Sequence, residues 1–251
     1  MRTIAITGAA TGIGASMKRH LESEGHRVIG VDIRQSDIIA DLSNVQGRQS
    51  AIENLKSVAD LDTLITCAGL GSHVPDKAAI ASVNYFGSTE LVTALAPILA
   101  TRDGKVVMIS SNSAPQSSDP TFVDLLLSGD EEAARQRATE IEGHPVYSGS
   151  KLAVARWMRR QCPEFARSGL RINAIAPGYI ETPMTAAVAN DPTYGAAIKK
   201  FVESIPVGRP GRPEDIASVV AFLLSPAADF ICGSVLFVDG AHDAMMRPDV
   251  V

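Results

Sequence analysis

A tyrosine and a lysine four positions apart, Tyr147 and Lys151, are the residues whose types and spacing best suit proton chemistry. Four positions place both side chains on one face of a helix. A free tyrosine hydroxyl titrates at about 10, so alone it is a poor acid–base catalyst at neutral pH. A cation beside it favours the phenolate and lowers its pKa, as general acid–base catalysis requires. Exposed helices often carry such a pair, so this one predicts chemistry only together with other features.

A run of polar residues, Ser110-Ser111-Asn112-Ser113, follows the apolar stretch Val106–Ile109. In open α/β sheets the carboxyl ends of the strands are where ligands bind. A serine hydroxyl there can donate a hydrogen bond to a substrate oxygen on which negative charge develops. Serines after a strand are also ordinary turn formers. The residues alone therefore do not decide among Ser110, Ser111 and Ser113.

A glycine-rich loop, Thr7 to Gly14, follows the first apolar run and precedes an amphipathic helical pattern. Glycines there permit a tight turn and let backbone amides approach a pyrophosphate at a helix N-terminus. Strand-to-helix turns also use glycine for purely structural reasons. The order of strand, loop and helix favours a dinucleotide site.

Asp32 closes the second apolar run, where a carboxylate can accept hydrogen bonds from both ribose hydroxyls of adenosine. The same charge would repel a 2′-phosphate, and Thr11 in the loop supplies no positive charge to offset it. Arg34 is the nearby residue that could receive a phosphate. The sequence thus predicts NAD as cofactor and disfavours NADP without excluding it.

Short apolar runs alternate with helical patterns along the chain. The expected strands are Thr3–Thr7, Arg27–Val31, Leu64–Cys67, Lys105–Ser110, Arg171–Ala176 and Val235–Val238. The expected helices are Ile13–Glu24, Val45–Val58, Ala79–Leu99, Tyr147–Arg167 and Pro213–Leu224. Strands separated by helices predict an α/β fold with a doubly wound parallel sheet, helices covering both faces.

The segment at about 115–143 interrupts this alternation with a second helical pattern, Asp130–Glu142. We expect a helical insertion above one end of the sheet, with a plain surface insertion as the alternative. The chain shows no repeat or interdomain linker, so residues 1–251 are expected to form one domain.

The composition of the chain argues against several classes of binding partner. The formal net charge of -5 argues against nucleic acid and anionic membranes. No apolar stretch is long enough to span a bilayer, and a first strand starting by Thr3 leaves no room for a signal peptide. Three widely spaced cysteines suit reduced thiols, so a cytoplasmic protein is expected. The five histidines show no metal-ligand spacing, so no metal is expected.

Together these features resemble the short-chain dehydrogenase/reductase family over nearly the whole chain, which implies a Rossmann-like fold. The resemblance implies a catalytic set of Asn84, Ser111, Tyr147 and Lys151. It implies a cofactor-binding set of Gly8, Thr11, Gly12, Ile13, Gly14, Asp32, Asp41, Leu42, Cys67, Ala68, Gly69, Tyr147, Lys151, Pro177, Gly178 and Thr182. Cys67 departs from the asparagine of most members, and we interpret it as a packing residue.

The family's chemistry implies that NADH gives hydride to a carbonyl carbon while Tyr147 protonates the oxygen and Ser111 holds it. Lys151 would bind the nicotinamide ribose and lower the pKa of Tyr147, and Asn84 would support a water leading protons onward. Further details resemble bacterial hydroxysteroid dehydrogenases/carbonyl reductases, including Ile39-Ala-Asp-Leu42 and the insertion. This favours a small apolar alcohol or ketone as substrate, a hydroxysteroid first.

Two alternatives remain at this stage. The substrate could be a smaller alicyclic or terpenoid alcohol, or the protein could be a dinucleotide-binding regulator without catalysis. Substrate identity is expected to depend on Tyr179–Ile205 and the insertion. The resemblance implies a homodimer, with Thr121–Glu142 packed over a helical face close to the partner subunit; a lid over the substrate is the competing role.

Overall fold

The fold is built on one parallel sheet, seen in a computed structural model that describes residues 1–189 and 195–250. The strand order is β3-β2-β1-β4-β5-β6-β7, and every neighbouring pair is parallel. The strands are β1 (Thr3–Thr7), β2 (Arg27–Asp32), β3 (Ile38–Ile39), β4 (Thr63–Thr66), β5 (Lys105–Ile109), β6 (Arg171–Pro177) and β7 (Val235–Val238). The predicted doubly wound, Rossmann-like α/β fold is confirmed.

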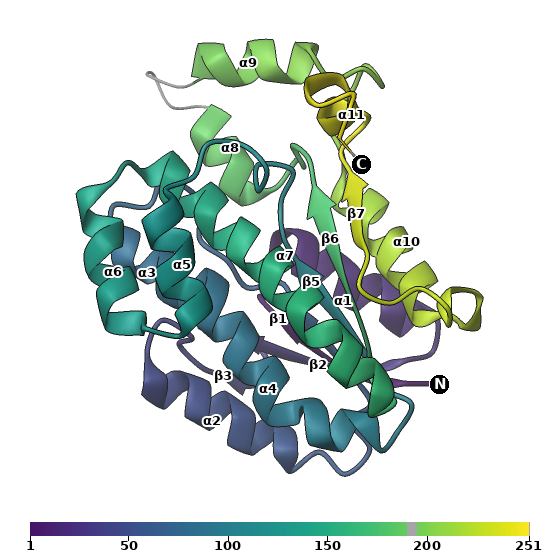
Figure 1. Cartoon of the computed structure of the whole chain (residues 1–251). Helices are drawn as coiled ribbons and strands as arrows, with labels where there is room; N and C mark the ends of the chain where they lie inside the picture. The colour runs from purple at the N-terminus through teal and green to yellow at the C-terminus, as the bar shows by residue number, and fades with distance from the viewer. Residues whose placement is uncertain (190–194, 251) are drawn as a thin grey trace.

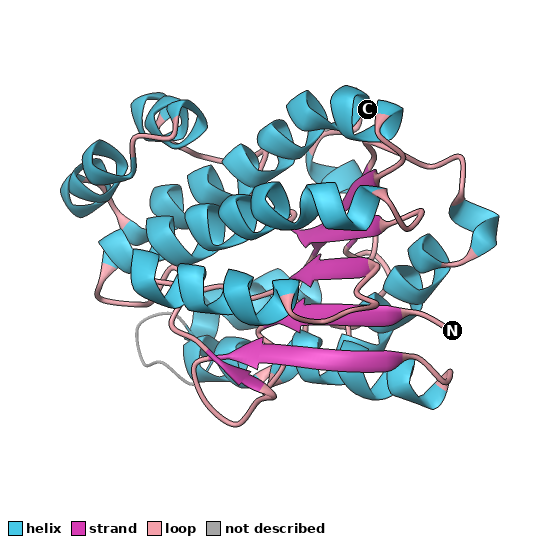
Figure 2. Ribbon diagram, turned by 90° about the horizontal axis from the view of Figure 1, so that it is seen from below, coloured by secondary structure: helices cyan, strands magenta, loops and turns pink. Residues whose placement is uncertain are grey.

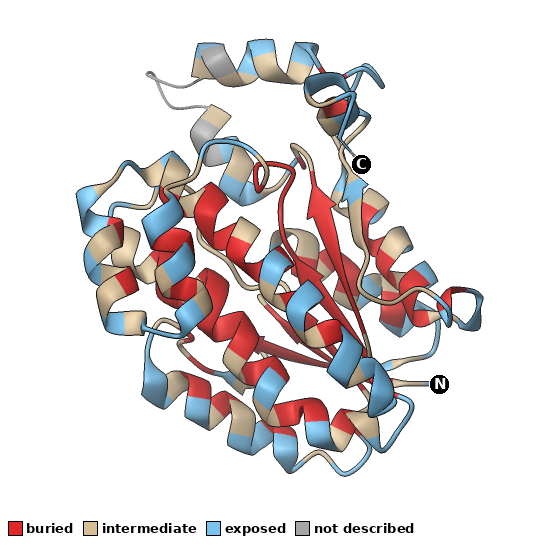
Figure 3. Ribbon diagram, viewed as in Figure 1, coloured by how far each residue is buried: buried red, intermediate tan, exposed pale blue. Residues whose placement is uncertain are grey.

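Helices cover both faces of the sheet (Figures 1 and 2). One face carries α1 (Gly12–Ser23) and α10 (Pro213–Leu224), which pack against each other. The other carries α2 (Val45–Lys56), α4 (Gly87–Ala100) and α7 (Gly143–Arg167). Strands β1, β4 and β5 are buried along their whole length, as Figure 3 shows, which explains their near-continuous apolar sequences.

The helix expected over Ala79–Leu99 is broken into three pieces, so that prediction was wrong in detail. A short helix α3 (Lys77–Ala81) passes into a π-helical turn η1 (Ser82–Phe86) before α4 begins. A π turn changes the direction of the side chains that follow it without changing the apolar character of the segment. The apolar pattern therefore could not reveal it.

The expected insertion forms two helices, α5 (Pro120–Ser128) and α6 (Glu131–Glu140). Asp119 and Asp130 cap them by accepting hydrogen bonds from Phe122 N and Ala133 N. Helix α5 packs against α7 and α6 packs against α3, so both lie beside the main body (Figure 1). The apolar side chains of α5 thus cover the helix that carries Tyr147.

The chain beyond β6 contains helices that the sequence did not predict. They are α8 (Pro183–Ala189), α9 (Gly195–Glu203), the 3₁₀ turn η2 (Pro226–Ala228) and α11 (His242–Met246). Helices α8 and α9 lie beyond the carboxyl end of β6 (Figure 1). Part of the expected substrate region, residues 190–194, lies outside the described residues.

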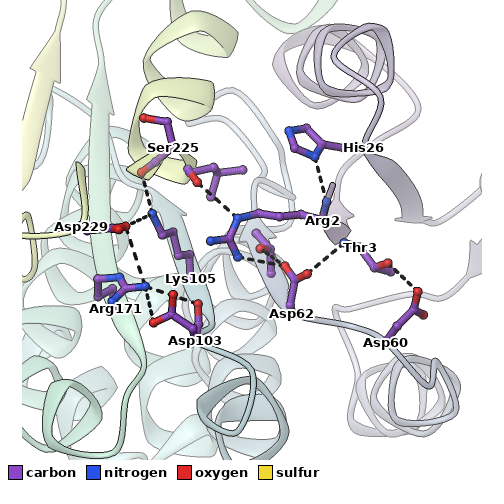
Figure 4. A network of polar contacts seen from close by, with 12 residues as sticks. Arg2, Thr3, His26, Asp60, Asp62, Asp103, Lys105, Arg171, Ser225 and Asp229 are labelled. Carbon is purple, nitrogen blue, oxygen red and sulfur yellow. Dashed lines mark hydrogen bonds and ion pairs between the residues drawn. The ribbon is translucent and has the colours of Figure 1, made fainter. Parts of the chain in front are cut away.

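The amino-terminal edge of the sheet carries a network of charged groups, drawn in Figure 4. Lys105 Nζ lies 2.7 Å from the Asp229 carboxylate, and Arg2 lies 3.2 Å from Asp62. Arg171 pairs with Asp103 at 2.6 Å. Since these cations are already paired with carboxylates, this edge has a structural role, and ligand chemistry belongs at the other end of the strands.

Candidate functional site

A cleft of about 460 Å³ opens at the carboxyl ends of β1, β2, β4, β5 and β6. It brings together every predicted cofactor-binding residue and three of the four predicted catalytic ones. The predicted residues that line it are Gly8, Thr11, Gly12, Ile13, Gly14, Asp32, Asp41, Leu42, Cys67, Ala68, Gly69, Ser111, Tyr147, Lys151, Pro177, Gly178 and Thr182. Residues from seven separate segments of the chain thus meet in one place.

The glycine loop can hold a group that needs close backbone approach. Gly8 and Gly12 have φ of +71° and +55°, in the left-handed region that favours glycine. A Cβ on Gly14 would lie 2.0 Å from the carbonyl oxygen of Gly8, so no side chain fits there. The glycines thus permit the tight turn that brings the N-terminus of α1 to the cleft, where it can face an anionic group such as the pyrophosphate of a dinucleotide.

Asp32 is fixed beside this loop at the end of β2. Its Oδ2 accepts a hydrogen bond from Ala10 N at 3.0 Å, and its Oδ1 accepts one from Ile33 N at 2.7 Å. A carboxylate oxygen has more than one lone pair, so both oxygens keep acceptor capacity toward the cleft. The glycine loop and Asp32 together fit the adenosine half of NAD.

The three serines after β5 have different partners, and these separate their roles. The Ser110 hydroxyl donates to the carbonyl oxygen of Lys151 at 2.9 Å, which ties β5 to α7. The Ser113 hydroxyl donates to Ser111 Oγ at 3.0 Å. The Ser111 hydroxyl lies near enough to the Tyr147 hydroxyl to lower the pKa of that tyrosine. This geometry favours Ser111, the serine chosen by resemblance, as the one that meets the substrate oxygen.

Tyr147 and Lys151 project from the first turns of α7 into the cleft, four residues apart as predicted. Helix α7 begins at Gly143, four residues earlier than the expected start at Tyr147. Lys151 Nζ donates to the carbonyl oxygen of Ile109 at 2.9 Å. An ammonium has three donors, so two remain for other acceptors in the cleft, such as ribose hydroxyls.

The predicted lowering of the Tyr147 pKa is not what the structure gives. Burial raises the pKa of the Tyr147 hydroxyl, and the hydrogen bond from Ser111 is what opposes the rise. Burial also lowers the pKa of Lys151 to about 8. The physical reason is that Lys151 is directed to Ile109 and its charge is itself disfavoured in the interior, so desolvation dominates both groups.

Asn84 does not line the cleft but lies buried behind it, in the π turn η1. Its Oδ1 accepts a hydrogen bond from Leu70 N at 2.7 Å, and its Nδ2 donates to Leu70 O and to Ser150 Oγ, both at 3.1 Å. The π turn directs this amide toward the segment after β4. Asn84 thus joins that segment to α7, and no substrate contact follows from its position.

Cys67 faces the cleft, and burial raises the pKa of its thiol to about 12. A thiol that stays protonated is a poor nucleophile. The backbone N–H groups of Cys67 and Ala68 both donate to Thr7 Oγ1 at 3.0 Å. The position therefore serves packing and backbone geometry, as the sequence suggested.

Apolar residues also line the cleft, some within the expected substrate region Tyr179–Ile205 and some outside it, where the sequence did not predict them. They are contributed mainly by the segments after β4, before Asn84 and after β6, and include Leu70, Ala79, Val83, Ile180, Pro183 and Met184. For Leu70 and Val83, the only signal in the sequence was that they stand next to the predicted residues Gly69 and Asn84. They make one part of the cleft apolar.

Comparison with known proteins agrees with this geometry. Residues 2–121 match the family described as short chain dehydrogenase, and residues 133–241 match the one described as enoyl-(acyl carrier protein) reductase. A curated 3-alpha-hydroxysteroid dehydrogenase/carbonyl reductase from Comamonas testosteroni is 43% identical, with 99% of each chain covered. The chain belongs to the short-chain dehydrogenase/reductase family.

Two further members of this family place the chain within it. A crystal structure of the 3-alpha-hydroxysteroid dehydrogenase from Pseudomonas sp. B-0831 complexed with NADH superimposes with a TM-score of 0.93 at 41% identity, covering 99% of this chain and 100% of that one. A cis-4-hydroxycyclohexanecarboxylate dehydrogenase from Sinomonas cyclohexanicum is 30% identical, with 97% of each chain covered. All three relatives are named for oxidation or reduction at an alcohol or carbonyl group.

Two features that other proteins use for membranes or metals are absent from the described part of this dehydrogenase/reductase. No helix among residues 1–189 and 195–250 is long and apolar enough to cross a membrane. Within the same part of the chain, no group of three or more His, Cys, Asp or Glu side chains is arranged to hold a metal ion.

Proposed function

We propose that the protein is an NAD-dependent dehydrogenase/reductase that interconverts a secondary alcohol and a ketone, with a 3α-hydroxysteroid as its substrate. The observation that carries this proposal is the meeting of Ser111, Tyr147 and Lys151 in the same cleft as the glycine loop and Asp32. A regulator that only senses a dinucleotide has no use for the first three residues. We treat residues 1–251 as one catalytic domain with the insertion as part of it.

Each residue of this set has a defined task. Bound NAD accepts a hydride from the alcohol carbon, and bound NADH returns one to the ketone carbon. Tyr147 exchanges the proton with the substrate oxygen, and Ser111, which lies beside Tyr147 in the cleft, holds that oxygen. Lys151 directs its free donors to the nicotinamide ribose, and Asn84 supports the cleft wall through Leu70 and Ser150.

The substrate class follows from the apolar part of the cleft and from the relatives. Leu70, Val83 and Met184 offer no charge or hydrogen-bond donor to a substrate, which suits a fused-ring hydrocarbon skeleton. The two relatives above 40% identity are named for 3α-hydroxysteroids. A smaller alicyclic alcohol, as in the third relative's name, is the second candidate.

The test is an absorbance assay for NADH over a panel of alcohols and ketones. The panel pairs a 3α-hydroxysteroid with its 3β epimer, and adds cyclohexanol, a hydroxycyclohexanecarboxylate and a monoterpenoid alcohol. The highest kcat/KM is expected for the 3α-hydroxysteroid. A higher kcat/KM for a small alicyclic alcohol would show that this alcohol, and not a steroid, is the substrate. If the protein binds NAD but turns over no member of the panel, the remaining candidate is the dinucleotide-binding regulator.

Cofactor preference is expected to depend on Asp32. NAD should be strongly preferred over NADP, because the carboxylate at the end of β2 would face the 2′-phosphate. Asp32→Ala should lower the ratio of kcat/KM with NAD to kcat/KM with NADP by at least about tenfold. The reason is that the contact between the Asp32 carboxylate and the 2′-phosphate, which have like charges, costs several kcal/mol. Steady-state kinetics with both cofactors measure it. Equal efficiency with NADP in the wild-type protein would contradict this role for Asp32.

We also propose a cytoplasmic protein that acts as a homodimer. The three cysteines are free, although Cys162 Sγ and Cys232 Sγ lie 3.2 Å apart, which suits a reducing compartment. For the dimer, the apolar side chains of the insertion are turned inward, so we assign the contact to a different face from the one first expected. Large exposed apolar residues gather instead near the edge strand β7, at Phe222, Phe230, Phe237, Met245 and Met246.

Light scattering at micromolar concentration is expected to give twice the mass of the chain. Phe230→Asp should shift the mass toward the monomer, because the Phe230 side chain is fully exposed beside β7 in the single chain. Ile39→Asp, at the opposite edge of the sheet, is the matched control and should leave the mass unchanged. A tetramer would contradict the proposal, and an unaffected dimer of Phe230→Asp would move the contact to another face.

A further inference from the structure

The insertion is joined to the NAD cleft through one buried arginine. Arg48, at the end of the first turn of α2, has no exposed surface. Its guanidinium donates to the Glu131 carboxylate at 3.2 and 2.5 Å, and to the Glu90 carboxylate at 2.7 Å. Glu131 is the first residue of α6, so this arginine connects the insertion with α2 and α4.

The same guanidinium also holds the wall of the cleft. Arg48 Nη1 donates to the carbonyl oxygen of Leu42 at 3.3 Å, and Leu42 lines the cleft next to Asp41. The start of α2 is pressed closely on this loop, because a Cβ on Gly47 would lie 1.9 Å from the carbonyl oxygen of Asp41. The position of Leu42 is therefore set by α2 and by the arginine that α2 carries.

Glu131 has a further contact, which reaches the turn that holds Asn84. The Ser82 hydroxyl donates to Glu131 Oε1 at 2.7 Å, and Arg135 donates to Ser82 Oγ at 2.6 Å. Ser82 is the first residue of the π turn η1. One carboxylate of the insertion thus meets both the α2 arginine and the beginning of that turn.

Glu131 is the partner of Arg48 whose removal should matter most. It pairs with Arg48 through both carboxylate oxygens, and its side chain is 22% exposed, against 39% for Glu90. Without Glu131, the buried guanidinium keeps only the more exposed Glu90 as its counter-charge, and weakening a buried pair in this way is costlier than losing a surface pair. The arginine must then turn toward other acceptors, and its contact with Leu42 is the one free to change.

We propose that Glu131 is a positioning residue for the cofactor: through Arg48 it fixes Leu42, which with Asp41 resembles the family's adenine-contacting pair, and so shapes the adenine end of the NAD cleft. This inference depends on the proposed placement of NAD. It gives the insertion a fixed structural task, different from that of a lid that opens for substrate. The insertion is held by buried charges at α6 and by Phe122 and Val123 against α7, so motion of the whole segment would break both contacts.

The test compares Glu131→Gln with Glu132→Gln. The second variant is the matched control, because Glu132 is the next residue along α6, is exposed and has no hydrogen-bond or ion-pair partner among the described residues. For Glu131→Gln we expect the KM for NAD to rise on the order of tenfold, within the range of coupling effects through packed networks, while kcat changes much less. The control should match the wild-type protein in both constants.

A second measurement separates binding of the adenine half of the cofactor from binding of the nicotinamide half. The Kd of ADP, measured by calorimetry, should rise in the same proportion as the KM for NAD in Glu131→Gln. The KM for nicotinamide mononucleotide, which has no adenine, should be unchanged. Glu131→Asp, which keeps the charge, should recover part of the loss.

The outcomes separate this inference from the proposed function. A lower Tm for Glu131→Gln with unchanged KM and Kd would show a purely structural ion pair and overturn the inference. A changed KM for the steroid with an unchanged KM for NAD would also overturn it, in favour of a substrate lid. If Asp32→Ala leaves cofactor preference untouched, the NAD placement itself is wrong, whatever Glu131→Gln does.

Discussion

Tyr147→Phe is expected to lower kcat by roughly a hundred- to ten-thousand-fold, the usual range for the loss of a general acid or base, while NADH binding changes little. The variant removes one hydroxyl and keeps the ring, so the packing of α7 is retained. The hydroxyl lies in the cleft beside Ser111 and is the group that we assign to proton exchange with the substrate oxygen. Steady-state kinetics with the preferred substrate, and a fluorescence titration with NADH, measure the two quantities.

The pH profile gives this prediction a second signature. Burial raises the pKa of Tyr147 above its ordinary value, so the protonated form persists through neutral pH. Ketone reduction uses that form, so with NADH saturating, titration of Tyr147 should lower kcat/KM only when the pH rises beyond the ordinary tyrosine range, and any decline through about pH 8 would follow the charge of Lys151 instead. Alcohol oxidation uses the phenolate, and its kcat/KM should rise with pH.

Tyr85→Phe is the control for the loss of a tyrosine hydroxyl. Tyr85 is buried in the core and does not line the cleft, so turnover should be close to that of the wild-type protein. If Tyr147→Phe retains a tenth of wild-type activity, the proton donor must be sought elsewhere.

The sheet and most of the cleft could be predicted from the sequence because both depend on local patterns. Central strands such as Lys105–Ile109 are buried on both faces and are therefore apolar throughout, which makes them easy to locate. Strand β3 was missed because two residues, Ile38–Ile39, carry no periodicity. The glycine loop was recognisable since its backbone geometry permits only glycine at Gly14.

The remaining features depend on contacts between distant residues. The pairing of Arg48 with Glu131 joins positions 83 residues apart, and nothing near either residue indicates it. The sequence favours Ser111 over Ser110 only by resemblance, and the physical reason, the hydrogen bond from Ser110 to the Lys151 carbonyl oxygen, joins residues 41 positions apart. The direction of the Tyr147 pKa could not be predicted from helical spacing, because it depends on how far the hydroxyl is desolvated.

Lys151→Met is expected to weaken NADH binding as well as lowering kcat, in contrast to Tyr147→Phe. Methionine approximates the length and volume of the lysine stem, so the change chiefly removes the ammonium. That ammonium lies in the cleft with one donor on the Ile109 carbonyl oxygen, and we assign its other donors to the nicotinamide ribose. Losing it removes the contact that we assign to the ribose, so NADH should bind more weakly and its nicotinamide should be held less firmly for hydride transfer. The value of kcat/KM should therefore fall through both constants.

If the charge of Lys151 contributes to cofactor binding, the NADH affinity of the wild-type protein should depend on pH. Burial lowers the pKa of Lys151 to about 8, so the ammonium is charged below that pH and becomes neutral as the pH rises through it. The charged form favours an anionic dinucleotide, so NADH affinity should decline as the pH rises through about 8. A fluorescence titration from neutral to alkaline pH measures this decline, which should vanish in Lys151→Met and persist in Tyr147→Phe. If NADH affinity declines in the same way in Lys151→Met, another group is titrating, and the charge of Lys151 does not contribute to cofactor binding.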